Sequence, residues 1–424
     1  MIDIKLIREN PEKYQQAAID KHFDVDIARL IELDASIRDL KAKLQDIATE
    51  KNSVGKTIPK LSPDEKKDAL AKLASLKEDE GKVDSELKEL TPEFDKLMLF
   101  VPQPSDEDVP LGKDDTENVE LRKVGEIREF DFEPKDHVQL GIDLDMLDIE
   151  RGVKLAGTRN YFLKGDGAML HWAVLRFSID FMNQRGYTPM SVPLLMREEA
   201  MRGTGYFPGA EEQTYMLERD QLSLVGTAEV PLTAYHSDEI LSEDDLPVKI
   251  CAMSNCFRRE AGAAGKDTHG LYRIHQFEKV EQVIICKNDI EESKKYHDEI
   301  LANSEGVLQA LKLPYRVVNV CSGDLGKGQA KKYDIETWMP SRESYGETHS
   351  ASRFYDFQAR RMNLRYKEKD TKRNVFCHTL NNTVIASPRV LIPIMELYQN
   401  ADGSITIPEV LRPYMGGKEK IVKK

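Results

Sequence analysis

The sequence lacks the long apolar runs that mark membrane proteins. No segment approaches the roughly 18 consecutive apolar residues that a membrane-spanning helix needs. The first six residues, 1–6, already mix charged and apolar side chains, so we expect no secretory signal peptide there. Together these absences argue against a membrane protein and against a secreted one.

Cysteine is scarce, and the cysteines do not form pairs of the CxxC type. This spacing argues against a disulfide framework and against a zinc knuckle. We therefore expect the chain to work in a reducing compartment, the cytoplasm. The five cysteines are Cys251, Cys256, Cys286, Cys321 and Cys377.

Basic residues are outnumbered by acidic ones, 61 to 74, which leaves a net charge of −13. A general basic coat for nucleic acid is therefore excluded, although a local basic patch is not. Charged residues make up 32% of the 424 residues, above the roughly 25% of ordinary globular chains. Some segment of the chain must hold the extra charge.

The N-terminal hundred residues carry apolar side chains at alternating spacings of three and four, in two separate stretches. Lys51 interrupts the first series and Glu80 interrupts the second. Two such series with charged flanks are typical of a coiled coil. The first series is Leu30, Leu33, Ile37, Leu40, Leu44, Ile47 and Val54, and the second is Leu73, Leu76, Val83, Leu87, Leu90, Phe94 and Leu97.

The segment between the two stretches is rich in helix-breaking residues, among them Gly55 and Pro59. Ser62 followed by Pro63 is a typical start for the second helix, as N-cap and first helical residue. The pattern therefore predicts two helices that fold back on each other antiparallel. We expect Pro92 to kink or end the second helix.

The turn of this hairpin is basic. Two interpretations stay open: a solvated coiled coil that serves as spacer or dimer contact, and an arm whose tip binds a nucleic-acid backbone. Between 51 and 67 only Asp64 and Glu65 oppose five lysines, Lys51, Lys56, Lys60, Lys66 and Lys67.

An acidic segment punctuated by prolines, 100–110, follows the hairpin and predicts a linker. We place the domain boundary there, with a first domain at 1–103 and a second at 104–424. Strand patterns cluster in the second domain without regular βαβ alternation, which predicts an α+β fold on a mostly antiparallel sheet. The predicted helices are 134–149, 168–186, 289–312 and 388–399, and the predicted strands are 222–229, 249–260, 272–286, 315–320 and 333–338.

Polar residues recur at every second position in three of the predicted strands. Such residues share one face of a strand. Each pattern alone is typical of a strand with one polar face toward solvent. Together they suit an amino acid bound beside a nucleotide, with carboxylates for an ammonium group and an arginine for a carboxylate or phosphate. The sets are Thr227 with Glu229, Arg258 with Glu260, and Phe277 with Lys279 and Glu281.

At this point several motifs resemble one known family. The segment 258–281 resembles motif 2 of class II aminoacyl-tRNA synthetases, and Thr227-Ala228-Glu229 resembles the TxE loop of the bacterial seryl-tRNA synthetases. Segments 356–361 and 378–389 resemble motif 3 and its approach, and 186–193 resembles motif 1, the dimer element. The helical hairpin resembles the tRNA-binding arm of the same family. The resemblance covers almost the whole chain in the right order.

The resemblance implies roles for individual residues. Arg258 and Arg389 are the implied catalytic residues. The implied serine-binding residues are Thr227, Ala228, Glu229, Arg258, Glu281 and Thr383. The implied ATP-binding residues are Arg258, Arg259, Glu260, Arg273, Ile274, Phe277, Glu347, Thr348, His349, Ser350 and Arg389. Mg²⁺, bound together with ATP, would be held by Glu347 and Ser350, whose oxygen atoms suit a hard ion.

The implied activity is formation of seryl-adenylate from ATP and L-serine, followed by transfer to the 3′-terminal adenosine of tRNA(Ser). tRNA(Sec) is a second candidate acceptor, and a homodimer through motif 1 is implied. Two alternatives stay open: a class II paralogue that loads a non-tRNA acceptor, and a non-catalytic RNA-binding module.

Four positions depart from the family pattern: His349, Arg353, Thr383 and Pro388. Thr383 keeps a hydroxyl where serine is common. Ser387 and Pro388 would cap and begin a helix, which would place Arg389 at a helix start facing the site.

Overall fold

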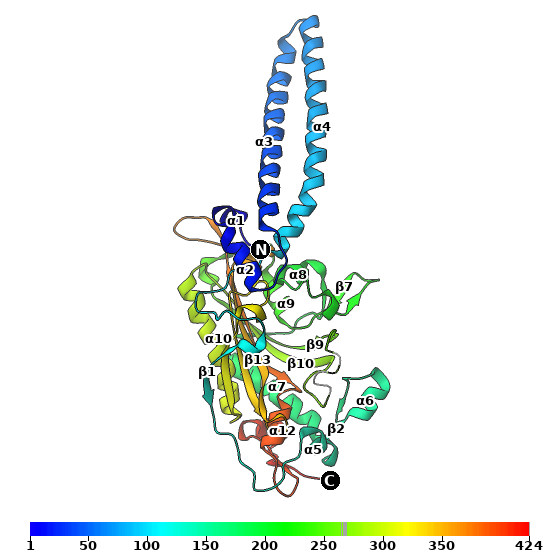
Figure 1. Cartoon of the computed structure of the whole chain (residues 1–424), viewed down its shortest axis with the longest axis vertical. Coiled ribbons are helices and arrows are strands. Elements are labelled where there is room, and N and C mark those ends of the chain that lie inside the picture. Colours follow the sequence, from blue (N-terminus) through cyan, green and yellow to red (C-terminus); the bar gives the residue numbers. More distant parts are fainter. Residues whose placement is uncertain (264, 266–268, 424) are drawn as a thin grey trace. The chain divides into compact units, whose positions relative to one another are not determined.

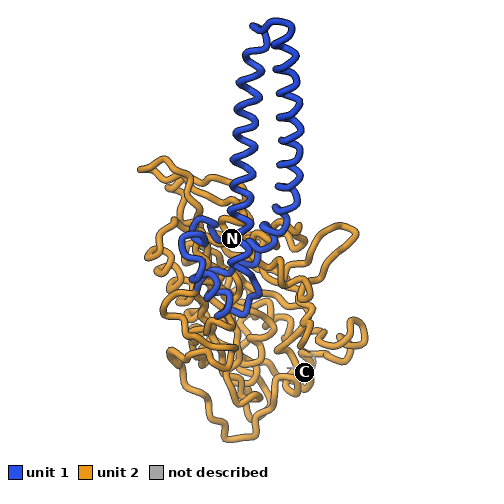
Figure 2. The backbone as a smooth tube through the Cα atoms, turned by 45° about the horizontal axis from the view of Figure 1, so that its top comes forward, with its two compact units in different colours: residues 1–104 blue, residues 105–424 orange. Residues whose placement is uncertain are grey.

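The computed structural model describes residues 1–263, 265 and 269–423. The chain divides into two compact units, 1–104 and 105–424, which Figure 2 shows in different colours. The first unit is helical in its regular elements, and the second contains all the strands. The predicted combination of a helical hairpin with an α+β domain is confirmed.

The first unit is built around the predicted hairpin, whose two long helices lie side by side (Figure 1). The side chain of Asp26 accepts a hydrogen bond from the Arg29 N–H and caps the first long helix. Ser62 and Glu65 form a capping box at the start of the second, with Pro63 as its first residue, as predicted. The helices are α1 (Ile4–Glu9), α2 (Pro11–Asp20), α3 (Ile27–Thr57), the short 3₁₀ turn η1 (Ile58–Lys60) and α4 (Pro63–Phe100).

Helix α4 does not end at Pro92 but continues to Phe100. Proline costs the helix one backbone hydrogen bond. The apolar series continues beyond the proline through Phe94 and Leu97, and Met98 is buried. Packing on this face outweighs the local loss.

The second unit is organised by one eight-stranded sheet. Each strand pairs antiparallel with its neighbours, except that β4 pairs parallel with β9 at one edge. The predicted mostly antiparallel sheet is therefore confirmed. In order across the sheet, the strands are β1 (Val119–Val124), β11 (Tyr315–Asn319), β12 (Lys331–Met339), β13 (Ser344–Tyr355), β16 (His378–Ser387), β10 (Gln276–Cys286), β9 (Val248–Phe257) and β4 (Thr188–Met190).

Two long helices, α7 (Asp166–Gln184) and α10 (Ile290–Ala310), cover one face of this sheet. Val280 and Ile284 of β10 join the main apolar core on that face, and Gln282 donates to the Ile300 carbonyl of α10. Because side chains alternate along a strand, Phe277, Lys279 and Glu281 point to the opposite face. That opposite face carries the candidate site.

Shorter elements complete the second unit. They are η2 (Asp115–Glu117), α5 (His137–Asp143), β2 (Leu147–Asp148), α6 (Ile149–Ala156), β3 (Phe162–Leu163), β5 (Leu195–Arg197), α8 (Glu198–Thr204), η3 (Glu211–Gln213), β6 (Met216–Leu217), β7 (Leu222–Leu224), α9 (Glu229–Thr233), η4 (Ala234–His236), β8 (Ile240–Ser242), η5 (Glu243–Asp245), η6 (Ser322–Asp324), η7 (Pro340–Arg342), α11 (Phe357–Arg361), β14 (Arg365–Lys367), β15 (Asn374–Phe376), α12 (Leu391–Leu397), β17 (Ile405–Thr406), η8 (Glu409–Met415) and β18 (Lys420–Ile421).

Two predicted helices differ from the structure. The helix predicted at 134–149 is shorter in the structure: α5 ends at Asp143, Asp145 adopts a left-handed backbone (φ 58°), and β2 follows before α6 begins at Ile149. The helix predicted at 388–399 begins only at Leu391. In the part of the chain that is described, no helix has both the length and the apolarity required to cross a bilayer.

Candidate functional site

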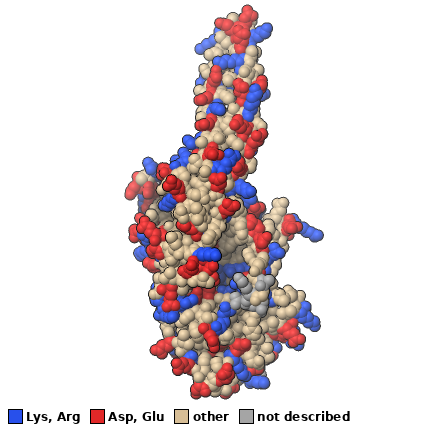
Figure 3. Space-filling view, in the orientation of Figure 1, with Lys and Arg blue, Asp and Glu red and all other residues tan. Residues whose placement is uncertain are grey.

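A hollow opens on the sheet face that α7 and α10 leave uncovered. Figure 3 shows this hollowed face, with lysine and arginine side chains inside it. It brings together eight of the site residues predicted from the sequence: Arg258, Glu260, Ile274, Phe277, Glu347, Thr348, Thr383 and Arg389. Leu271, Tyr272, Lys279 and Ala386 also line it.

Strand β10 contributes the face that alternation predicted. Phe277 and Lys279 line the hollow, and the Glu281 carboxylate lies against the Lys279 ammonium. The register of β10 with β16 places Thr383 directly opposite Glu281. Two neighbouring strands therefore place a carboxylate, an ammonium and a hydroxyl next to one another.

Lys279 is a site residue to which the sequence analysis assigned no role. Its side chain is buried, and its Nζ contacts Glu281 and donates to Thr383 Oγ1 at 3.1 Å. A buried ammonium is tolerated only with such partners. The position of Lys279 between Phe277 and Glu281, spaced by two, was the signal that could have identified it.

Thr227 and Glu229 lie in the site region, but not on a strand as predicted. Strand β7 ends at Leu224, and Glu229 begins helix α9. The Thr227 hydroxyl accepts the Glu229 N–H at 3.1 Å, a local turn that competes with extended backbone. Thr227 Oγ1 also lies 3.3 Å from Glu281 Oε2, so this loop still reaches the β10 cluster.

Glu229 is held by two buried donors. The Gln358 side-chain amide donates to Glu229 Oε1 at 2.8 Å, and the Tyr206 hydroxyl donates to Oε2 at 3.1 Å. Burial, together with the charge of Glu281, raises the pKa of Glu229 to about 7, against these two hydrogen bonds. Gln358 and Tyr206 were not predicted from the sequence, because they come from distant elements.

Arg258 and Glu260 share the hollow although β9 ends at Phe257. Glu260 has a left-handed backbone (φ 53°), and its carboxylate accepts from Arg273 at 2.7 Å. The Arg258 guanidinium lies over the Phe277 ring, 5.1 Å from its centroid. A loop rather than a strand therefore brings these side chains together.

Arg389 reaches the hollow from a turn, not from the predicted helix start. Ser387 is the last residue of β16, and its hydroxyl bonds His171 Nδ1 at 2.8 Å instead of capping a helix. Arg389 donates to the Tyr272 carbonyl at 3.0 Å and to the Glu347 carbonyl at 2.9 Å. Its guanidinium also lies 4.3 Å from the centroid of the Tyr272 ring.

Glu347 and Ser350 lie on the same face of β13 although they are three residues apart. The pairing with β12 shifts between Ile335 and Glu336, a bulge that sets Glu347 opposite Glu336 and Ser350 opposite Asp334. Among the described residues, no group of three or more carboxylate, histidine or cysteine side chains could hold a metal ion. A cation here would need further ligands, which fits a hard ion that is also held by phosphate and water.

The charges around this bulge favour an ionised Glu347. The protein surrounding Glu347 removes part of its water, which would raise its pKa, but Arg389, Lys332 and Arg258 outweigh this and hold the pKa below its ordinary value. Burial raises the pKa of Asp334, against the attraction of Lys332 at 3.3 Å. Of these two carboxyl groups, Glu347 is therefore the more readily ionised and the better oxygen ligand.

Several predicted positions lie away from the hollow. Arg259 is exposed and His349 is buried against Thr348 Oγ1 at 2.7 Å, with burial lowering the pKa of His349 to about 3. Ala228 is fully buried beside the Thr227 loop. Arg353, one of the departures from the family pattern, pairs with Asp106. This departure therefore does not alter the lining of the hollow.

Comparisons with known proteins agree with this geometry. Residues 1–104 match the family domain "Seryl-tRNA synthetase N-terminal domain", and residues 215–398 match "tRNA synthetase class II core domain (G, H, P, S and T)". The chain is 46% identical over 419 residues to the serine–tRNA ligase of Deinococcus radiodurans, covering 99% of this chain and 98% of the relative. It is 44% identical to that of Fervidobacterium nodosum, with 98% of each chain covered.

Two solved structures are similar over the full length. The crystal structure of seryl-tRNA synthetase from Pyrococcus horikoshii complexed with ATP has a TM-score of 0.93 and 36% identity, with 100% of both chains covered. The cytoplasmic serine–tRNA ligase of Naegleria fowleri in complex with AMP has a TM-score of 0.89 and 34% identity, covering 100% of this chain and 99% of that one.

Proposed function

The chain belongs to the seryl-tRNA synthetase family, and we propose that it activates L-serine with ATP and transfers the seryl group to the 3′-terminal adenosine of tRNA(Ser). One observation carries the proposal. The cluster of Glu281, Lys279 and Thr383, which suits an amino acid, adjoins the arginines Arg258 and Arg389, which suit phosphates.

The proposed reaction needs no nucleophilic side chain. The serine carboxylate oxygen attacks the α-phosphorus of ATP in line, and the bond to pyrophosphate breaks. A hydroxyl of the terminal adenosine then attacks the acyl carbon, and AMP leaves with its phosphate charge. Arg258 and Arg389 carry fixed donors that neutralise charge as it moves between these oxygens, so positioning and electrostatics supply the catalysis.

ATP is proposed to lie over Phe277, with Glu260 accepting from the adenine amino group and Arg273 facing the terminal phosphate. Glu260 and Arg273 bond each other at 2.7 Å, so the two side chains proposed to contact the adenine and the terminal phosphate lie side by side. Ile274 and Thr348 line the same hollow. Arg259 and His349, which are ATP contacts by resemblance, do not line the hollow: Arg259 follows β9, and His349 lies within β13.

Serine is proposed to place its ammonium group among Thr227, Glu229 and Glu281, and its hydroxyl at Thr383. The Thr383 hydroxyl accepts from Lys279, which leaves its own proton free to donate to the substrate hydroxyl. A substrate without that hydroxyl would leave buried polar groups unpaired. The site therefore favours serine over alanine.

Glu347 and Ser350 would hold Mg²⁺ bound with ATP, since they present oxygen ligands on one face and Glu347 stays ionised. When bound, the ion would neutralise phosphate charge. Lys332, which pairs with Asp334 at 3.3 Å, also helps to hold the pKa of Glu347 below its ordinary value.

A homodimer through the motif 1 region is part of the proposal. Strand β4, which lies in this region, is an edge strand of the sheet. Helix α7 exposes Met169 and Trp172, the latter to 57%, and Met253 of β9 is also exposed. Exposed large apolar side chains and an open sheet edge are both features of protein–protein interfaces.

The helical hairpin is proposed to bind the tRNA. Its turn carries Lys56, Lys60, Lys66 and Lys67, whose charges suit the RNA backbone.

The five buried cysteines are all free thiols, which supports a cytoplasmic location.

The test is serine-dependent exchange of pyrophosphate into ATP together with charging of purified tRNA(Ser). We expect both activities in the full chain, and exchange without charging after deletion of residues 35–90. A paralogue for another acceptor would exchange but not charge tRNA(Ser), and a non-catalytic module would do neither. Charging of tRNA(Sec), the second candidate acceptor, is measured in the same assay.

A further inference from the structure

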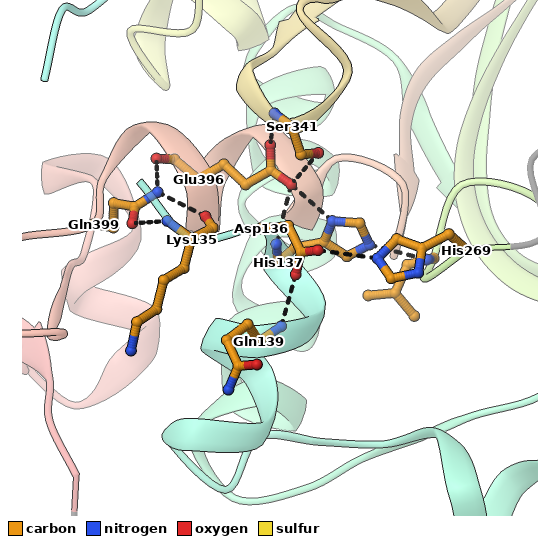
Figure 4. A network of polar contacts seen from close by, with 9 residues as sticks. Lys135, Asp136, His137, Gln139, His269, Ser341, Glu396 and Gln399 are labelled. Atoms are coloured by element: carbon orange, nitrogen blue, oxygen red, sulfur yellow. Dashed lines mark hydrogen bonds and ion pairs between the residues drawn. The ribbon is translucent and has the colours of Figure 1, made fainter. Parts of the chain in front are cut away.

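A buried polar network joins α5 and α12 to the segment that precedes β10 (Figure 4). At its centre the Glu396 carboxylate of α12 is fully buried. It accepts hydrogen bonds from His137 Nδ1 at 2.7 Å and from the His137 backbone at 3.1 Å. Ser341 adds its hydroxyl at 2.7 Å and its N–H at 2.9 Å. Four donors thus satisfy this buried carboxylate.

The hydrogen bonds assign the protonation of the His137 ring. The Leu271 backbone N–H donates to His137 Nε2 at 3.2 Å, so Nε2 carries no proton. The ring proton is therefore on Nδ1, where it is donated to Glu396. His137 is thus a directional link between a carboxylate of α12 and the backbone of Leu271.

The start of α5 holds the same segment at a second point. Asp136 caps α5 by accepting the Gln139 N–H at 2.8 Å, and its other oxygen bonds His269 Nε2 at 3.0 Å. Gly270, between the two contacts, has φ +67°, and a Cβ there would lie 2.0 Å from His137 Nε2. The segment is packed so closely on the ring that only glycine fits.

Gln399 fixes α5 to the end of α12. Its side-chain oxygen accepts the Lys135 N–H at 2.9 Å, and its nitrogen donates to the Lys135 carbonyl at 2.9 Å. The same nitrogen donates to the Glu396 carbonyl at 2.8 Å. The chain that carries His137 is therefore attached to α12 at two points: at Lys135 through Gln399, and at His137 through Glu396.

These contacts connect α12 with the hollow through a continuous series of bonds. Glu396 bonds His137, and His137 bonds the Leu271 backbone. The carbonyl of the next residue, Tyr272, accepts from Arg389 Nε at 3.0 Å. Arg389 lies in the turn that leads into α12, which carries Glu396. The distance between α12 and the Tyr272 backbone therefore depends on the His137 ring.

We propose that His137 is a positioning residue for ATP: by holding Leu271 against α12, it places the Tyr272 carbonyl that orients the Arg389 guanidinium. This inference rests on the proposed function, in which Arg389 binds ATP. The side-chain bonds of Glu281, Lys279 and Thr383 run among these residues and to Thr227, whereas those of His137 run to Glu396 and Leu271. His137 therefore acts on ATP and not on serine.

The experiment measures ATP and serine dependence of pyrophosphate exchange in the full chain. His137→Ala removes both links of the ring, and we expect KM for ATP to rise about tenfold while KM for serine changes less than about twofold. A parallel rise of both constants would overturn the proposal.

Two conservative variants distinguish a role of His137 in positioning Leu271 from a role in hydrogen bonding to Glu396 alone. His137→Gln keeps an acceptor within reach of the Leu271 N–H, whereas His137→Asn keeps a donor for Glu396 but does not reach Leu271. We expect Gln to restore KM for ATP to within about threefold of the parent value and Asn to leave it elevated, even where Asn has the higher Tm. Equal rescue by both, or rescue by Asn alone, would contradict the positioning role.

Calorimetric titration with ATP distinguishes the failure of this inference from a failure of the proposed function. If the parent protein binds ATP without serine-dependent exchange, the proposed function fails. The same titration still tests His137, since the alanine variant should bind ATP about tenfold more weakly. Unchanged ATP affinity in a folded alanine variant would refute the inference by itself.

Discussion

Lys51 and Glu80 form an ion pair across the helical hairpin, with 2.7 Å between Nζ and Oε2. They are the two polar residues that interrupt the apolar series of α3 and α4. Each side chain is about one-third exposed, at 30% and 34%. If the two helices shifted along each other, Lys51 and Glu80 would each lose the opposite charge that pairs with it. The pair therefore favours one register of the antiparallel hairpin.

Reversing one charge should loosen this part of the hairpin. In Lys51→Glu two carboxylates face each other, and we expect amide hydrogen exchange in residues 47–55 to accelerate about two- to fivefold. The double variant Lys51→Glu/Glu80→Lys should restore the slow exchange, because it restores opposite charges. If the double variant exchanges as fast as the single one, the pair does not determine the register.

Serine use should depend on the ionisation of Glu229. Burial and Glu281 raise the pKa of Glu229 to about 7, so lowering the pH below 7 neutralises this carboxylate, which we propose to face the serine ammonium. We expect kcat/KM for serine in pyrophosphate exchange to fall as the pH drops, approaching tenfold per pH unit. Glu229→Gln should be less active and flat over this range. A parent profile that stays flat between pH 5.5 and 7.5 would argue against a role for this ionisation.

Removing the Tyr206 hydroxyl should move the same profile. That hydroxyl donates to Glu229 Oε2 at 3.1 Å and stabilises the ionised form. In Tyr206→Phe the pKa of Glu229 should rise further, so the loss of activity begins at higher pH. The measurement is the pH at which kcat/KM for serine reaches half its plateau. A shift to lower pH would contradict this role for the hydroxyl.

Thr383 should discriminate serine from alanine. Thr383→Val removes the hydroxyl that accepts from Lys279 and keeps a similar shape. We expect the ratio of kcat/KM for serine over alanine to fall about 10- to 100-fold. Thr49→Val is a matched control, because among the described residues its hydroxyl bonds the Gln45 side chain and carbonyl, both within α3. An unchanged ratio in Thr383→Val would show that the hydroxyl is read elsewhere.

Arg258 should not be replaceable by lysine. Arg258→Lys keeps a positive charge but loses the planar fork of donors that can contact two oxygens at once. We expect kcat/KM for exchange to fall about 10²- to 10³-fold. Arg151→Lys is the control, since Arg151 is 75% exposed and pairs with Asp148 at the surface. Comparable activity of the two variants would remove Arg258 from the proposed chemistry.

Strong local patterns predicted the elements they dominate. The paired apolar series, Ser62 and Pro63 were sufficient for the hairpin, because capping and seam packing act within one supersecondary unit. Strands β9, β10, β11 and β12 carry enough apolar alternation to be recognised. Strands β13 and β16 were not predicted, although both lie in the centre of the sheet. Many of their Ser, Thr, His and Asn side chains are buried, and other elements bond some of them, as Ser304 of α10 bonds Asn382 and Gln358 of α11 bonds Thr379. No local pattern reveals such compensation.

The predicted positions of Thr227, Glu229 and Arg389 show the same limit. Thr227 and Glu229 were assigned to a strand, and Arg389 to a helix start. In the structure Thr227 lies in a loop, Glu229 in the first turn of α9 and Arg389 in a turn. The side chains still converge, because distant partners hold them. Phe257 donates its N–H to the Val225 carbonyl beside the Thr227 loop, and the Arg389 side chain donates to the Tyr272 carbonyl.

By itself, the sequence determined the helical hairpin, the antiparallel sheet and the motif residues, since periodicity, capping and residue chemistry are local properties. Only the tertiary structure decided that Lys279 lies between Glu281 and Thr383, that Gln358 holds Glu229, and that His137 connects Glu396 to Leu271. Apart from the Lys279–Glu281 pair within β10, each of these contacts joins residues from different elements. Burial makes such contacts obligatory, because a polar group removed from water must find its partner wherever the fold places one.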